Sequence, residues 1–388
     1  KLQTYYDERM DDVKEAKWTE KGALCGDSSA MWQIGSFYKN GFGVEENPEK
    51  SFYWFQKSAM AGHSDGMWFL GDCYRDGYGT EQDIEKAIQW YEKSAEKENC
   101  YGMLRLADLY DTGEFVEQNS ELAAKWYRKA ADAGNRDAMY YVAYNYEYGD
   151  GVEQNEAEAK KWYRKAADEG CAPAQRRIGD YYADEEKYKD AMRWYEKAAE
   201  QGDGASFNEI GLMYSNGNGV RQDANKAFGW FQRSAEAGFG WGLFNLAQCY
   251  EYGDGVQQND RIAKKWYEKA ANKSLAEAEC RMGEYCYDAG DYAKARYWYK
   301  RAADRGDGRA MNMQGLLRSL EKYGLYNERK AVEYFRQSAE AGYGWGMYNL
   351  AHCYETGSGV QKNLKLAGEW YAKAADEGIE PAIEWLNG

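Results

Sequence analysis

Apolar side chains recur every three or four residues along most of this chain, with polar or charged residues between them. The segment 159–167 is a clear case, because good helix formers there surround apolar residues that lie three and four positions apart. A second kind of segment places apolar or small residues at i, i+1 and i+4, as in Leu70, Gly71 and Tyr74, which is one stripe of an amphipathic helix. The two kinds alternate, so the pattern predicts an all-α chain of paired helices.

The paired segments repeat at a fixed spacing that the tryptophans mark. Ten of the fifteen tryptophans lie 36 or 32 residues apart, and a tyrosine holds one place in the same series. We call this series the tryptophan ladder: Trp18, Trp54, Trp90, Trp126, Trp162, Trp194, Trp230, Trp266, Trp298, Tyr334 and Trp370. Because neither helix of a unit can bury its apolar stripe alone, the units are expected to stack, with the ladder aromatics as the core. Loss of one buried ladder ring is expected to cost about 3–5 kcal/mol.

A series of small residues runs with the same step, and we call its members the small positions: Gly35, Gly71, Ala107, Ala143, Gly179, Gly211, Ala247, Gly283, Gly315 and Ala351. A small residue is expected there because another helix crosses at that point. Five units carry a Gly-x-Gly-Val turn between their helices, as at 149–152, and 77–80 is a near match; a glycine such as Gly134 follows the second helix. Each unit therefore reads helix, glycine turn, helix.

The combined pattern Ala-x3-Leu-Gly-x2-Tyr-x2-Gly-x-Gly-Val-x9-Ala-x2-Trp-Tyr-x-Lys-Ala-Ala-x2-Gly resembles the Sel1-like repeat family, which is related to the tetratricopeptide repeats. The resemblance covers the chain from about residue 7 to its last residue. It implies an all-α, right-handed α/α superhelical solenoid of about ten helix-turn-helix repeats plus terminal half-repeats. The expected divisions are an N-terminal half-repeat equivalent to a second helix (1–26), an array of ten repeats (27–378), and the start of a further repeat or a C-terminal cap (379–388).

Charge and composition narrow the classes of partner. Sixty-five acidic against fifty basic residues give a net charge of −15, which argues against nucleic acid because its binding draws on excess Lys and Arg. A mean hydropathy of −0.90 and no run of eighteen apolar residues argue against membrane insertion. A protein or peptide of basic or amphipathic character fits this charge better. Eight cysteines with almost no possible bridge favour a reducing, cytoplasmic location, and a secreted or lumenal location stays open.

The residue types that usually carry catalysis are not grouped in the sequence. His63 and His352 lie some eight repeats apart, so histidine-dependent nucleophile arrangements are unavailable. The Gly-x-Gly-Val turn lacks the third glycine and the Lys-Ser/Thr of a phosphate-binding loop, and it recurs from unit to unit. We therefore expect no catalytic residue, no metal and no cofactor, and predict that the chain is not an enzyme.

A ligand is expected on the concave face, which the resemblance implies is lined by the first helix of each unit. Counted from the small position, the outward-turned positions are −6, −3, −2 and +1. Aromatic and arginine side chains there are of the types that carry binding hot spots, and two recurring asparagines are suited to bond a peptide backbone. The expected binding residues are Trp32, Trp68, Phe69, Arg105, Tyr140, Tyr141, Tyr144, Arg176, Arg177, Trp241, Asn245, Arg281, Trp345 and Asn349.

Other interpretations of these residues are open. Trp32 and Trp68 are also placed to pack against the neighbouring helix, and the arginines to form only salt bridges with the acidic surface. Our first functional hypothesis is a non-enzymatic scaffold or adaptor that binds a peptide or protein segment on the concave face. The alternative is a sensor or regulatory repeat segment of a larger multidomain enzyme or signalling protein, which recognises a small ligand or docks an effector domain. The incomplete units at both ends of the sequence motivate that alternative.

Overall fold

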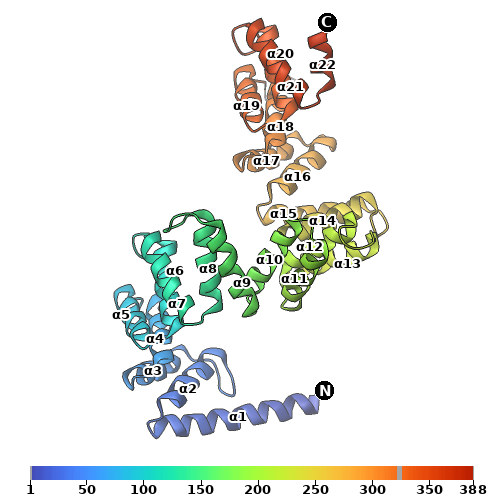
Figure 1. Ribbon diagram of the computed structural model, residues 1–388. Helices are drawn as coiled ribbons and strands as arrows, with labels where there is room; N and C mark the ends of the chain where they lie inside the picture. Colours follow the sequence, from blue (N-terminus) through green and yellow to red (C-terminus); the bar gives the residue numbers. More distant parts are fainter. Residues whose placement is uncertain (1, 321–325, 388) are drawn as a thin grey trace. The chain divides into compact units, whose positions relative to one another are not determined.

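The computed structural model describes residues 2–320 and 326–387 (Figure 1). In that part of the chain there are 22 α-helices and no strand, which confirms the predicted all-α repeat solenoid. The chain divides into two compact units, one up to Asp184 and one from Glu185 onward, and we describe each by itself. The division falls in one of the two shortened helix-to-helix connections, 185–187.

Unit 1 alternates second and first helices of successive repeats. Its first helices are α2 (Ser28–Asn40), α4 (Ser64–Asp76), α6 (Cys100–Thr112), α8 (Arg136–Tyr148) and α10 (Ala172–Asp184). Its second helices are α1 (Leu2–Leu24), α3 (Pro48–Met60), α5 (Ile84–Glu96), α7 (Ser120–Asp132) and α9 (Glu156–Asp168).

Unit 2 continues the same alternation. Its first helices are α12 (Gly204–Asn216), α14 (Gly240–Tyr252), α16 (Ala276–Asp288), α18 (Gly308–Ser319), α20 (Gly344–Thr356) and the short α22 (Glu380–Asn387). Its second helices are α11 (Tyr188–Glu200), α13 (Ala224–Glu236), α15 (Asp260–Asn272), α17 (Tyr292–Asp304), α19 (Glu328–Glu340) and α21 (Leu364–Asp376).

The glycine turns have two separate steric reasons for their glycines. Gly149 ends α8 in the left-handed region, at φ 74°, where its N–H donates to the carbonyl of Asn145. Gly151 also has a positive φ, and a Cβ there would lie 2.1 Å from the backbone oxygen of Ser120 in the preceding repeat. The turn therefore fixes the contact between neighbouring repeats as well as the reversal of the chain.

The buried core lies one residue beyond the tryptophan ladder. The residue that follows each ladder position from Trp54 onward is Tyr or Phe and is at most 4% exposed: Phe55, Tyr91, Tyr127, Tyr163, Tyr195, Phe231, Tyr267, Tyr299, Phe335 and Tyr371. These rings lie against the small positions, because a Cβ on Gly71 would be 2.5 Å from the ring of Tyr91. The expectation that a helix crosses at the small positions is confirmed.

Most of the tryptophan ladder is not core, so that part of the prediction was wrong. Three ladder residues are buried: Trp54, Trp162 and Trp194. Trp18 is 71% exposed, and the other ladder aromatics are half-buried. The reason is that a lysine or arginine three residues on covers the outer face of most of these rings, as where Lys93 Nζ lies 4.1 Å from the centroid of Trp90.

Some first helices of neighbouring repeats contact one another directly, as well as through the second helix between them. In unit 1, α2 contacts α4 and α4 contacts α6; in unit 2, α12 contacts α14, α16 contacts α18, and α18 contacts α20. Neighbouring second helices make fewer such contacts among the described residues. A stack curves toward its closer-packed side, so within each unit the first helices line the inner face.

Candidate functional site

The predicted aromatic residues near the start of unit 1 form a stack between α4 and α6. The Trp68 and Tyr101 rings are stacked with centroids 5.6 Å apart, and the Arg105 guanidinium lies 5.4 Å from the centroid of Trp68. Trp68 Nε1 donates to Asp65 at 3.1 Å, which restrains the orientation of the indole. Phe69 lies on the side of this stack that faces the buried core, with its ring 4.8 Å from the ring of Phe55.

Trp32 takes a more interior place on α2. Its ring stacks on His63 at 5.8 Å, and its Nε1 is buried with no hydrogen-bond partner. This placement matches the packing interpretation for Trp32, and Trp68 is likewise half-buried and packed against its neighbours.

The predicted tyrosines of α8 continue the aromatic row with more exposure. Tyr141 is 37% exposed and stacks on Tyr127 at 4.7 Å, and Tyr144 is 40% exposed beside Tyr148. The Tyr140 ring instead packs toward the core, with its centroid 5.5 Å from that of the Tyr163 ring. The structure therefore leaves two tyrosine rings of α8 open on the inner face.

The predicted arginines join neighbouring repeats through shared carboxylates. Arg177 on α10 pairs with Glu147 on α8, which also accepts a 2.7 Å hydrogen bond from the core hydroxyl of Tyr163. Burial alone would raise the pKa of Glu147, but the hydrogen bonds from Arg177 and Tyr163 outweigh it and hold that pKa below its usual value.

Arg281 and Arg105 also pair with a carboxylate of the preceding repeat, whereas Arg176 pairs with a carboxylate of its own helix. Arg281 pairs with Glu251, which accepts from Tyr267 at 2.7 Å. Arg105 lies 3.1 Å from Asp72. Arg176 lies 3.0 Å from Asp180 one helical turn on.

The predicted residues of unit 2 are two exposed indoles and two paired asparagines. Trp241 is 40% exposed and Trp345 is 42% exposed, and each meets an aromatic ring edge-on, at 5.6 Å and 5.7 Å. Asn245 donates to Asn208 in the preceding first helix at 2.7 Å, and Asn349 donates to Asn312 at 2.8 Å. These asparagines connect neighbouring repeats. Trp241 and Trp345 keep part of their rings exposed to solvent.

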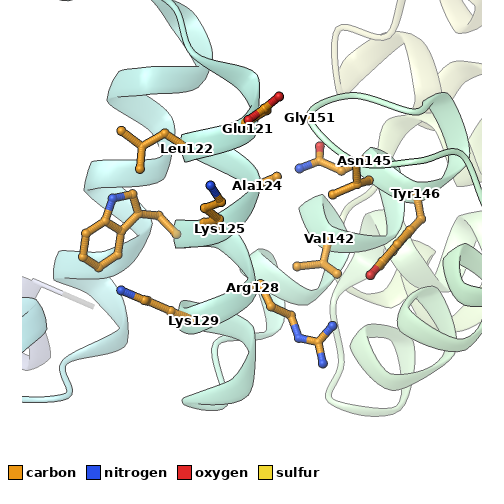
Figure 2. A pocket seen from close by; sticks show the side chains of 12 residues that line it. Glu121, Leu122, Ala124, Lys125, Arg128, Lys129, Val142, Asn145, Tyr146 and Gly151 are labelled. Carbon is orange, nitrogen blue, oxygen red and sulfur yellow. The ribbon is translucent and has the colours of Figure 1, made fainter.

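Sequence reasoning missed Tyr101, which is 50% exposed and completes the stack on Trp68. A signal was present, because Tyr101 lies six residues before Ala107, at the same position as Trp241 and Trp345 in their repeats. It also missed a half-open cavity of about 450 Å³ between α7, α8 and the turn that follows α8 (Figure 2). None of the fourteen predicted residues lines this cavity.

The described residues offer little for metal or nucleophile chemistry. They contain no group of three or more His, Cys, Asp or Glu placed to hold a metal ion. Burial raises the pKa of Cys73 and of Cys249 to about 12, which disfavours their reactive thiolates at neutral pH. In the part of the chain that the structure covers, every helix is too short or too polar to span a bilayer.

Comparison with known families accounts for the repeating architecture. The family profile described as Sel1 repeat matches ten consecutive segments: 28–63, 64–99, 100–135, 136–171, 172–203, 208–239, 242–275, 276–307, 310–343 and 346–379. The chain belongs to the Sel1 repeat family. Sel1 repeat proteins generally mediate protein–protein interactions.

The chain is also similar to a solved structure and, over a short segment, to two curated proteins. The chain is similar to c5321, a protective antigen present in uropathogenic Escherichia coli strains that displays an SLR fold, with 28% identity over 95% of this chain and 80% of that one and a TM-score of 0.64. It is also similar to the DAP3-binding cell death enhancer 1 of Rattus norvegicus, 42% identical over 88 residues, and of Mus musculus, 39% identical over 88 residues. Each of these two matches covers 23% of this chain and only 17% of the relative's length.

Proposed function

We propose that this Sel1 repeat protein is a non-enzymatic scaffold that binds an extended peptide or protein segment along the inner face of its first helices. The observation that carries the proposal is the row of open aromatic rings on that face. In unit 1 the row consists of the exposed rings of Tyr101, Tyr141 and Tyr144 with the half-buried Trp68 stacked on Tyr101, and unit 2 has its own exposed rings, Trp241 and Trp345. Open aromatic rings on a rigid surface are typical anchors for a partner's side chains.

The arginines take a supporting role in this proposal. Arg105 and Arg177 are held by carboxylates of the neighbouring repeat, so they stiffen the surface that presents the rings. A rigid surface loses less side-chain entropy on binding than a mobile one. The inner face also carries Asp108, whose pKa burial raises although Arg105 and Tyr127 oppose the shift. A basic or amphipathic segment suits such a face.

The family and one group of relatives support protein binding in general. Sel1 repeats bind proteins as a class, and the names of the rat and mouse relatives state that they bind DAP3. The matched segment is a small part of those relatives, so their partner serves here only as an example of the kind of ligand that such repeats take.

The test uses peptides selected from a displayed random library against the wild-type chain. Trp68→Ala and Trp241→Ala are then compared with the wild type by fluorescence anisotropy. Loss of an anchor ring is expected to weaken peptides that use it by about 2 kcal/mol, or roughly thirtyfold. Tyr53→Ala and Tyr297→Ala serve as matched controls, because these rings are 47% and 56% exposed on second helices. Selected peptides that bind all four variants like the wild type would refute the proposal.

A further inference from the structure

The cavity between α7 and α8 lies at a position where two of the other repeats carry a phenyl ring. In two other repeats a phenylalanine of the second helix meets a tyrosine of the next first helix edge-on: Phe52 with Tyr74 at 5.5 Å, and Phe228 with Tyr250 at 5.6 Å. The equivalent pair here is Ala124 and Tyr146, and both line the cavity. The cavity of about 450 Å³ therefore lies where a phenyl side chain would be.

Two other repeats have a small residue at this position, and in both a large side chain of the chain itself lies near. A Cβ on Gly368 would lie 3.6 Å from the ring of Trp385. Ala16, which is 1% exposed, belongs to a buried cluster with Tyr38 and Trp54. At Ala124 the space stays open, with Leu122, Val142 and Val152 as apolar walls.

A second exception occurs on the facing helix, where an amide replaces an apolar residue. Asn145 is only 6% exposed and lines the cavity, and its side chain has no hydrogen-bond partner among the described residues. Its amide atoms keep access to the open cavity, so they can form a hydrogen bond with a polar group of a ligand there. The residues at the same position in the other repeats are Phe37, Cys73, Leu109, Tyr181, Met213, Cys249, Tyr285, Leu317 and Cys353.

The charges around the cavity indicate the sign of that polar group. Lys125, Arg128 and Lys129 line it together with a single carboxylate, Glu121, although the whole chain carries a net charge of −15. Arg128 is paired with Asp132 at 3.0 Å, and Lys129 lies over the ring of Trp126. Lys125 has no ion-pair partner in the described part of the chain, and in Figure 2 it projects from α7 on the side of the cavity opposite Asn145.

We propose that this cavity binds a small aromatic carboxylate. The aromatic ring takes the place that Phe52 and Phe228 occupy in two other repeats, edge-on to Tyr146 and over Ala124. The carboxylate lies between Lys125 and Asn145, where it accepts a charge-assisted hydrogen bond from the ammonium and a second from the amide. A cavity of this volume is within the range of small-molecule sites, and a few fixed polar groups among apolar walls are typical of them. This site lies apart from the aromatic row of the inner face and does not depend on the function proposed for that row.

The test titrates the full chain with 3-phenylpropionate and with the neutral 3-phenylpropan-1-ol, by isothermal titration calorimetry and ligand-observed NMR. The wild type is expected to bind the carboxylate with a dissociation constant of about 1 mM or lower and to prefer it to the alcohol. Ala124→Phe restores the ring that Phe52 and Phe228 supply elsewhere, so it should fold normally and weaken binding of both probes by about tenfold or more. Absence of carboxylate binding to the wild type would overturn the proposal.

Two further variants separate the polar contacts from the apolar ones. Asn145→Cys introduces the residue that Cys73, Cys249 and Cys353 provide in other repeats, and Lys125→Gln removes the unpaired charge. Each is expected to weaken the carboxylate by about threefold to tenfold and to leave the alcohol unchanged. Ile88→Phe places the same ring at the equivalent position of the preceding repeat and is expected to leave both affinities unaltered. Equal binding by the wild type and Ala124→Phe would show that the probe binds elsewhere and overturn the assignment.

Discussion

In this protein a single carboxylate on one helix can bond side chains on the next two helices. Glu147 on α8 accepts a hydrogen bond from Tyr163 on α9 and pairs with Arg177 on α10. A buried tyrosine hydroxyl requires an acceptor, and the carboxylate in turn requires a compensating charge, so the three residues are needed together. At Glu355 the third partner is the neutral indole of Trp385, whose Nε1 donates at 2.8 Å.

Replacing Glu147 should therefore destabilise unit 1 in a pH-dependent way. We expect Glu147→Gln to cost about 1–3 kcal/mol at pH 7, because it leaves the half-buried Arg177 without its charge partner. The pKa of Glu147 is lowered in the folded state, so its contribution is complete above the unfolded carboxyl pKa of about 4.3 and is lost as pH falls through the lower folded pKa. Thermal melts of the two proteins should differ at pH 7 and converge toward pH 3.

Glu355→Gln is the matched control for this prediction. It also loses a carboxylate bonded to a core tyrosine, Tyr371, but it leaves no arginine unpaired at that place. A smaller loss is expected than for Glu147→Gln. Equal losses at pH 7 would show that the arginine contributes nothing beyond the tyrosine hydrogen bond.

At this scale the sequence predicted positions better than partners. It placed Arg105, Arg177 and Arg281 on first helices, and they lie on α6, α10 and α16. It did not predict that each would pair with a carboxylate in the preceding repeat, because Glu147 and Glu251 come 30 residues earlier and are only two of many acidic residues on charged helix faces. Their role in binding stays a prediction, since the structure contains no ligand.

The helix-turn-helix element depends on one glycine contact more than on the others. We expect Gly151→Ala to lower the melting temperature by far more than Gly134→Ala. Both glycines have positive φ, so both substitutions carry backbone strain of about 1 kcal/mol. Only at Gly151 would the new Cβ also meet a backbone oxygen, that of Ser120 at 2.1 Å, whereas nothing lies within 4 Å at Gly134. Circular dichroism melts measure the difference, and equal losses would contradict the importance of this contact.

The position of the core within each element was the part that periodicity could not resolve. Adjacent residues such as Trp90 and Tyr91 lie about 100° apart on a helix, so both fit the same broad apolar stripe. The regular spacing of the indoles drew attention to the tryptophans, yet the fully buried ring is Tyr91. The stem of Lys93 covers Trp90, and a lysine that follows an aromatic residue by three positions was the available signal.

At the scale of the whole molecule, stability should be local. Each repeat packs mainly on its neighbours, so the array behaves as a row of coupled elements instead of a single cooperative core. This arrangement permits a small residue at Ala124 beside a cavity, while the neighbouring repeats keep their packing.

A core truncation in unit 2 should therefore leave the start of unit 1 unaffected. Phe231 is 4% exposed and packs in one cluster with Leu246 and Tyr267, so Phe231→Ala should cost about 3–5 kcal/mol locally. Hydrogen exchange followed by mass spectrometry should show faster exchange in α12 to α15 and unchanged protection in α2 to α6. Tyr252→Ala, at a ring that is 61% exposed, should change neither region. Faster exchange along the entire chain in Phe231→Ala would mean that all repeats unfold together. Only global cooperativity would transmit the destabilisation from one lost ring across so many interfaces between repeats.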